Sequence, residues 1–199
     1  GCSARALNAV GIANCSTSSL GVGTHSILAS YGGSTAHAAS VSATLSQVIS
    51  ASAPSAVASF VGTDLVTRGN WKDGYGRDGY GIVGDSSNYP AYATVTATGK
   101  HDHVWAVQPD GDARALQRGA VTGRIAACWY SASSFDVDVN LTDQGSHRVA
   151  VYLLDWDDIG RVARVDVLDA TTQQVLDTRT VSSYQQGVYL TWNLTGHVV

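Results

Sequence analysis

The sequence predicts an all-β protein, in which a β-sandwich follows a shorter β segment. Only 14% of the 199 residues are charged, whereas glycine occurs 21 times and proline 3 times. Ser, Thr, Ala and Val recur in short runs that alternate apolar and polar side chains, and no long helical period appears. This composition favours short strands joined by turns over helices.

Charge and hydropathy narrow the partners that the chain can bind. The formal net charge is −4 and the isoelectric point is near 5.8, which argues against binding to nucleic acid or to an anionic membrane. No apolar run approaches the length of a membrane span. The chain contains no methionine, not even at its first position. We therefore expect a mature or excised part of a longer protein whose targeting segment lies upstream.

Two of the three cysteines are spaced for a disulfide. Cys2 and Cys15 flank two short segments, with Asn8-Ala9 between them. A hairpin with a tight turn at Asn8-Ala9 would bring the cysteines to the Cα separation of about 5.5 Å that a disulfide needs. The bridge indicates an oxidising compartment, so the protein is expected to be secreted or on the cell surface. Cys128 lies in an apolar run and is expected to be a small buried hydrophobe; no Cys/His spacing indicates zinc.

Residues 1–49 are expected to be β throughout. Apolar and polar side chains alternate along residues 26–31 and again along residues 41–46, as they do in half-buried strands. Gly32-Gly33 lies between these runs and is expected to turn the chain.

This first segment resembles the C-terminal part of the bacterial Ig-like repeats of long surface proteins. The resemblance is carried by residues 15–33, Cys-Ser-Thr-Ser-Ser-Leu-Gly-Val-Gly-Thr-His-Ser-Ile-Leu-Ala-Ser-Tyr-Gly-Gly, and by the closing Leu-Ser-Gln-Val at 45–48. It implies a partial repeat that lacks its front half, with roughly four strands, an exposed edge and an uncovered face. Such a segment is expected either to lean on the following domain or to belong to a longer protein.

Three regions are predicted along the chain. Residues 1–49 form the partial Ig-like repeat, and residues 50–57, rich in Ser and Ala around Pro54, form a linker. Residues 58–199 form a β-sandwich, a jelly roll or a similar arrangement of two packed antiparallel sheets. The expected strands from the linker onward are residues 56–61, 92–98, 103–107, 124–130, 135–141, 148–156, 163–168, 175–181 and 187–194.

The periodicity of these strands assigns their faces. Residues 124–130 are almost all apolar and suit a central strand covered on both sides, whereas residues 135–141 alternate cleanly and suit a strand with one buried face. In the last strand, Val188, Leu190, Trp192 and Leu194 are expected to share one face.

The second region resembles the galactose-binding-like jelly-roll domains of bacterial polysaccharide-active and surface proteins. The residues that carry this resemblance are 64–80, Trp129-Tyr130, 151–156 with Arg161, and 187–192. The resemblance implies a non-catalytic carbohydrate-binding module that binds sugars through loops at one end. Such modules often hold a structural Ca²⁺, and calcium is the one cofactor that the sequence suggests.

The stretch 69–80 is the first candidate site, because glycines punctuate it and neither a helix nor a strand fits its pattern. Trp71, Tyr75 and Tyr80 offer flat apolar faces on which a pyranose can pack. The polar partners would come from Asn70, Lys72, Asp73, Arg77 and Asp78. The alternative is that Trp71 folds inward to close one end of the sandwich, that the tyrosines lean on it, and that Asp78 accepts backbone N–H groups.

The stretch 154–161 is the second candidate and supports three interpretations. In the first, residues 157–160 form a turn and Arg161 pairs with Asp155. In the second, Asp155, Asp157 and Asp158 coordinate Ca²⁺. In the third, Trp156 and Asp157 reach the same ligand as the first loop.

Other chemistries have weaker support. A glycosidase needs two acids across a cleft, for which Asp73, Asp78, Asp155 and Asp157 are candidates without any conspicuous Glu. His101 and His103 point to one side of a strand and suit a divalent metal, but no third ligand is evident and a solvated turn is the alternative. The preferred function is therefore carbohydrate binding without catalysis, with a polysaccharide or glycan and other domains of the parent chain as partners. A structural or adhesive surface domain is second, and a glycan-active enzyme third.

Overall fold

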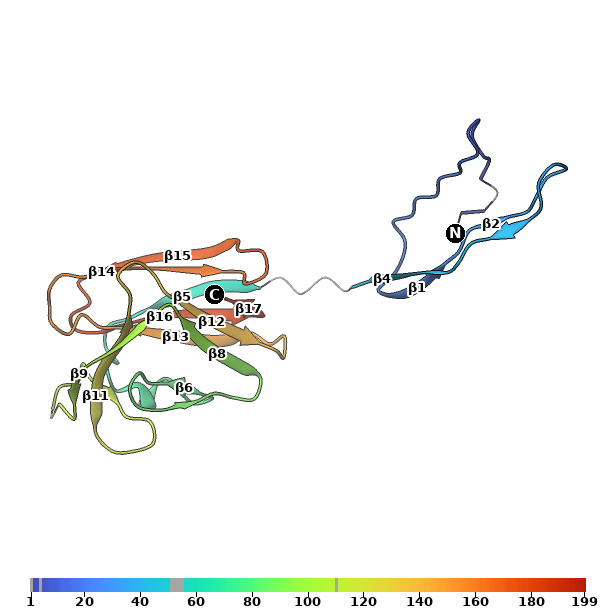
Figure 1. Cartoon of the computed structure of the whole chain (residues 1–199). Helices are drawn as coiled ribbons and strands as arrows, with labels where there is room; N and C mark the ends of the chain where they lie inside the picture. The colour runs from blue at the N-terminus through green and yellow to red at the C-terminus, as the bar shows by residue number, and fades with distance from the viewer. Residues whose placement is uncertain (1, 4, 51–55, 110) are drawn as a thin grey trace. The chain divides into compact units, whose positions relative to one another are not determined.

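The computed structural model describes residues 2–3, 5–50, 56–109 and 111–199, and the chain divides into two compact units, Gly1–Ala53 and Pro54–Val199. Within these residues the one helical segment is the short 3₁₀ helix η1 (Trp71–Asp73), and every other regular element is a strand (Figure 1). The predicted all-β class is confirmed. In the described part of the chain no helix is both long and apolar enough to cross a membrane. Most of the predicted linker, residues 50–57, lies outside the described residues.

The first unit is an antiparallel ribbon. Strand β1 (Gly23–Ile27) pairs with β4 (Leu45–Ile49), and β2 (Ser30–Tyr31) pairs with β3 (Ser40–Val41). The two continuous strands predicted here are each interrupted, because the Ser42 hydroxyl rather than a backbone carbonyl accepts the N–H of Ala29, at 3.0 Å. Most apolar side chains of the ribbon remain exposed, including Ile27, Val41 and Leu45.

Cys2 and Cys15 form the predicted disulfide, with their Cα atoms 5.9 Å apart. The turn between them lies one residue later than expected, since the N–H of Gly11 donates to the carbonyl oxygen of Asn8 at 2.9 Å and Ala9 and Val10 occupy its centre. The Asn8 side-chain oxygen accepts the N–H groups of Val10 and Ile12 at 3.0 and 2.9 Å. This side chain satisfies the turn internally, and residues 2–3 and 5–15 contain no regular strand.

The second unit is built from two layers of antiparallel strands. One layer has the order β13 (His147–Leu153), β16 (Val188–Thr195), β5 (Val57–Asp64). The other contains β8 (Ala93–Thr98), β12 (Asp136–Leu141) and β17 (His197–Val198). The pair β14 (Val162–Leu168) and β15 (Val175–Ser182) joins this second layer, because Leu168 and Val199 exchange backbone hydrogen bonds of 2.7 and 2.9 Å.

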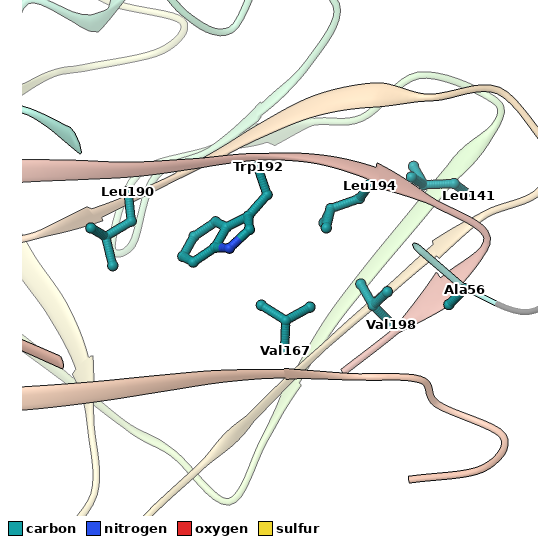
Figure 2. Close-up of a cluster of buried hydrophobic side chains, with 7 residues drawn as sticks. All are labelled: Ala56, Leu141, Val167, Leu190, Trp192, Leu194 and Val198. Carbon is teal, nitrogen blue, oxygen red and sulfur yellow. The ribbon is translucent and has the colours of Figure 1, made fainter. Parts of the chain in front are cut away.

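The core lies between these layers, as Figure 2 shows. Leu190, Trp192 and Leu194 project from β16 toward Val167 of β14 and Val198 of β17. Trp192 is only 2% exposed, its ring meets Phe60 edge-on at 5.5 Å, and its Nε1 donates to Asp177 Oδ2 at 2.6 Å. The indole therefore buries a large apolar surface while its one polar atom stays paired.

Two smaller sheets complete the unit. The first has the order β10 (Leu116–Gln117), β11 (Arg124–Tyr130), β9 (His101–Val107), and the second pairs β6 (Tyr80–Gly81) with β7 (Ser87–Asn88). The register between β9 and β11 shifts at Ala126 and Ala127, which pair with Ala106 and Val104. Trp105 is thus the extra residue of a β-bulge.

Most of the predicted strands of this unit are present, and two details differ. The strand expected at residues 148–156 ends at Leu153, because the N–H of Asp158 bonds to the carbonyl oxygen of Asp155 at 3.1 Å and turns the chain. The last strand buries more than the apolar face predicted from its sequence. Tyr189 and Thr191 are buried as well, since the rings of Tyr75 and Tyr152 cover Tyr189 at centroid distances of 4.4 and 4.6 Å.

Candidate functional site

The ring of Trp71 lies inside the protein, which corrects the expectation of an exposed stacking face. Trp71 is 5% exposed, and its Nε1 donates to the backbone oxygen of Gln117 at 2.7 Å. Its ring packs against Tyr80 with centroids 4.9 Å apart. A Cβ on Gly76 would stand 2.3 Å from the indole, so the chain can cross this ring only with glycine at that position. The inward alternative describes Trp71 correctly.

The loop that carries Trp71 is held by a distant segment, residues 112–119. The N–H of Gly69 donates to Ala113 O at 2.8 Å, and the N–H of Gln117 donates to Gly69 O at 2.9 Å. Arg124 donates to Ala115 O at 2.8 Å and to the side-chain oxygen of Asn70. These bonds give the loop a fixed shape although it contains almost no regular structure.

Asp64 and Tyr75 close the opposite side of the same loop. Asp64 accepts N–H bonds from Val66 at 2.7 Å and Thr67 at 3.0 Å, and the Tyr75 hydroxyl donates to it at 2.9 Å. Burial alone would raise the pKa of Asp64, but these hydrogen bonds outweigh it and lower the pKa from 3.8 to about 2. Burial and the bond to Asp64 raise the pKa of Tyr75 to about 12, so Asp64 is ionised and Tyr75 is neutral throughout the neutral range.

An open groove of about 360 Å³ lies over this loop. Its lining includes the three predicted aromatic residues, and charged side chains of both signs surround them: Trp71, Tyr75, Tyr80, Lys72, Asp73 and Arg77. The Lys72 ammonium donates to Gly119 O at 3.0 Å and lies 5.6 Å from the Trp71 ring centroid. Asp78 is exposed and, like Asn70, does not line the groove, so the structure brings together all but two of the site residues predicted on this loop.

One supporting carboxylate behind the groove had no signal in the sequence. Asp85 accepts the Nε–H of Arg118 at 2.5 Å, the N–H of Gly119 at 2.8 Å and the Ser86 hydroxyl at 2.9 Å. Burial opposes its ionisation, but these bonds outweigh it and lower its pKa. The Asp85 cluster fixes Gly119, where a Cβ would come 2.3 Å from the Tyr80 ring. Tyr80 is therefore clamped between Trp71 and the backbone at Gly119.

The second candidate loop adopts the turn interpretation. Asp155 is 2% exposed and accepts the N–H groups of Gly160 at 3.0 Å and Arg161 at 3.1 Å, together with the Arg161 guanidinium. Burial disfavours the charge on Asp155, yet the bonds from Arg161 and Gly160 lower its pKa. The oxygens of Asp155 are thus occupied. Nowhere in the described residues do three His, Cys, Asp or Glu side chains gather closely enough to hold a metal ion, and the calcium interpretation of Asp155, Asp157 and Asp158 is wrong.

Trp156 and Asp157 are not part of the groove. Arg114 lies 4.4 Å from the Trp156 ring centroid and donates to the backbone oxygen of Trp156 at 3.4 Å. Asp157 accepts Trp105 Nε1 at 2.9 Å and Arg161 at 3.0 Å. Neither residue lines the groove, so the structure does not bring the second loop into the groove of the first. Residues 112–119 hydrogen-bond to both loops.

The fold and the groove define an all-β protein with a loop-borne recess of mixed aromatic and charged lining. No protein-family model, no curated protein and no solved structure matches the chain.

Proposed function

We propose that this chain is a non-catalytic carbohydrate-binding module of a secreted or cell-surface protein, with the galactose-binding-like jelly-roll type as its closest class. The observation that supports it best is the groove over the η1 loop. Its volume of about 360 Å³ falls in the range of small-molecule sites, which are about 300–1,000 Å³ and combine apolar walls with a few polar groups.

The residues of the groove would have different roles in binding a sugar. Tyr80 and Tyr75, each partly exposed, present apolar ring surface to the C–H face of a sugar. Arg77 and Asp73 are exposed beside them and supply a hydrogen-bond donor and acceptor for hydroxyl groups. Trp71 supports the Tyr80 ring instead of stacking on the ligand. The disulfide between Cys2 and Cys15 fits an oxidising compartment outside the cytosol.

Burial of Trp71 favours a second candidate, a structural or adhesive domain of a surface protein with no sugar site. In that case the groove-lining aromatics serve only to close one end of the fold. The two candidates differ in whether an exposed residue of the groove contributes to sugar binding.

Affinity electrophoresis of the full chain in gels containing xylan, galactomannan or mixed-linkage β-glucan tests the proposal. We expect at least one polysaccharide to retard the protein and Arg77→Ala to weaken that retardation by ~tenfold, equivalent to one strong polar contact. Arg164→Ala is the matched control, because this arginine is also exposed but lies on β14 away from the groove lining. Absence of retardation of the wild-type protein by all of these polysaccharides would support the structural candidate, and retardation that Arg77→Ala leaves unchanged would contradict the groove as the binding site.

A further inference from the structure

One face of strands β9 and β11 carries a row of rings. His101, His103 and Trp105 alternate along β9, and Tyr130 of β11 pairs with His101 across the sheet, so all four side chains point to the same side. The ring centroids are 5.4 Å apart for His101 and Tyr130, 6.3 Å for Tyr130 and His103, and 5.3 Å for His103 and Trp105. These four residues are called the ring row below.

The ring row is open to solvent at one end and fixed at the other. Tyr130 is 48% exposed, more than any other tyrosine or tryptophan of the chain, and His101 and His103 are also exposed. At the other end the bulged Trp105 donates its Nε1–H to Asp157 at 2.9 Å, and the Arg161 guanidinium lies 5.9 Å from its ring centroid. The row is therefore a preformed surface that does not need to order on binding.

The charges beside the row exclude a phosphate-bearing ligand. Arg161 is already bonded to Asp155 and Asp157, and Lys100 is bonded to Asp102 at 2.7 Å. The chain as a whole is acidic, with a formal net charge of −4. Because the cations beside the row are paired in the part of the chain that the structure describes, stacked bases of a nucleic acid would find little counter-charge for their phosphates.

The polar atoms of the row remain available for a neutral ligand. Among the described residues, none hydrogen-bonds to the imidazole nitrogens of His101 and His103 or to the Tyr130 hydroxyl. No third metal ligand lies with the two histidines in the described part of the chain, which removes the divalent-metal interpretation of His101 and His103. Flat rings with unpaired hydrogen-bonding edges match a sugar, which has an apolar C–H face and a rim of hydroxyls.

We propose that the ring row is a second saccharide-binding surface, separate from the groove over the η1 loop. It rests on the proposed function for the class of ligand but uses none of the same residues. The rings follow one another along two strands, so the surface suits consecutive units of an extended polysaccharide better than a single terminal sugar. Two such surfaces on one chain would bind a long polysaccharide with avidity.

The test measures retention of the full chain on microcrystalline cellulose and chitin, and its retardation by soluble xylan. The double variant His103→Ala/Tyr130→Ala should lower the affinity for at least one of these by ~tenfold or more, as loss of an aromatic anchor does. The single variant Tyr130→Phe keeps the aromatic ring and should retain most of the wild-type affinity. Tyr31→Ala, which removes a tyrosine from the first unit, is the control.

The outcomes separate this inference from the proposed function. Loss of binding in the double variant but not in Arg77→Ala would support the ring row and contradict the groove. Loss in Arg77→Ala but not in the double variant would overturn the ring row and keep the groove. If wild-type protein is retained by none of the three polysaccharides, the ring-row proposal is overturned. Denaturation curves check folding, because substitutions at exposed positions should leave the unfolding midpoint almost unchanged.

Discussion

The indole Nε1 of Trp71 donates a hydrogen bond of 2.7 Å to the backbone oxygen of Gln117, a residue 46 positions further along the chain. This bond attaches the η1 loop to strand β10 and turns the tryptophan into a structural anchor. Since the ring is also 5% exposed, the groove above it depends on Trp71 for its shape and not for contact with a ligand.

We therefore expect Trp71→Ala to lower the free energy of unfolding by about 3–5 kcal/mol, the usual effect of removing a buried aromatic ring. Trp71→Phe keeps most of the apolar contact but leaves the Gln117 carbonyl without its donor, which should destabilise the fold by about 1–3 kcal/mol. Urea denaturation measures both. Val66→Ala, at an 88% exposed position on the same loop, should leave the midpoint unchanged. A wild-type midpoint for Trp71→Ala would mean that the ring is exposed in solution.

Asp64 should make the fold sensitive to acid. Its pKa is lowered from 3.8 to about 2 in the folded state, so the folded protein favours the carboxylate more strongly than the unfolded chain does. The resulting stabilisation is fully present above about pH 4 and is lost as the pH falls through about 2; a shift of this size is equivalent to roughly 2 kcal/mol.

Asp64→Asn tests this contribution. The variant should be less stable than wild type by roughly 2 kcal/mol at pH 7, and the difference should shrink between pH 4 and pH 2. Urea denaturation at several pH values measures it. Tyr75→Phe removes one of the three hydrogen-bond donors to Asp64 and should have a smaller effect in the same direction, about 1 kcal/mol. A pH-independent difference would show that Asp64 acts through packing alone.

Local sequence patterns predicted much of this fold, because strands and short turns are determined mainly by residues that are close together in the sequence. The apolar run at Arg124–Tyr130 is a strand with those bounds, and Asp155 pairs across a turn with Arg161, only six positions further along the chain. The disulfide likewise depends on residues close together in the sequence.

What the sequence could not predict depends on distant contacts. Burial of Trp71 requires a partner 46 residues away, and burial of both faces of β16 requires rings from Tyr75 and Tyr152, which come from other elements. Asp85 and Gly119 shape the groove from 34 residues apart. Sequence periodicity carries no information about such distant pairs. A loop whose aromatic rings are exposed and a loop whose rings are buried therefore have the same local sequence pattern.

The Asp155–Arg161 pair should show strong coupling. Asp155 is 2% exposed, so removing Arg161 leaves a buried carboxylate that keeps only its two backbone donors. We expect Arg161→Ala to destabilise the protein by about 2–3 kcal/mol, and Asp155→Asn/Arg161→Ala to cost less than the sum of the two single changes. A thermodynamic double-mutant cycle measures the coupling. The control is the pair of Arg164 with Asp166, in which the arginine side chain is 65% exposed. Its coupling energy by the same method should be less than about 1 kcal/mol. Equal coupling energies for the two pairs would contradict the role given to burial.

The three cysteines should differ in reactivity. Cys2 and Cys15 are joined in a disulfide, whereas Cys128 is free and partly buried on β11. Burial raises the pKa of the Cys128 thiol, so little thiolate is present at neutral pH and alkylation should be slow in the folded protein. Iodoacetamide labelling followed by mass spectrometry should therefore add one group in denaturant without reductant and three after reduction. The variant Cys128→Ser should add none before reduction. Three groups added to unreduced wild-type protein would show that the disulfide is absent in solution, and rapid labelling of the folded protein would show that β11 opens readily at Cys128.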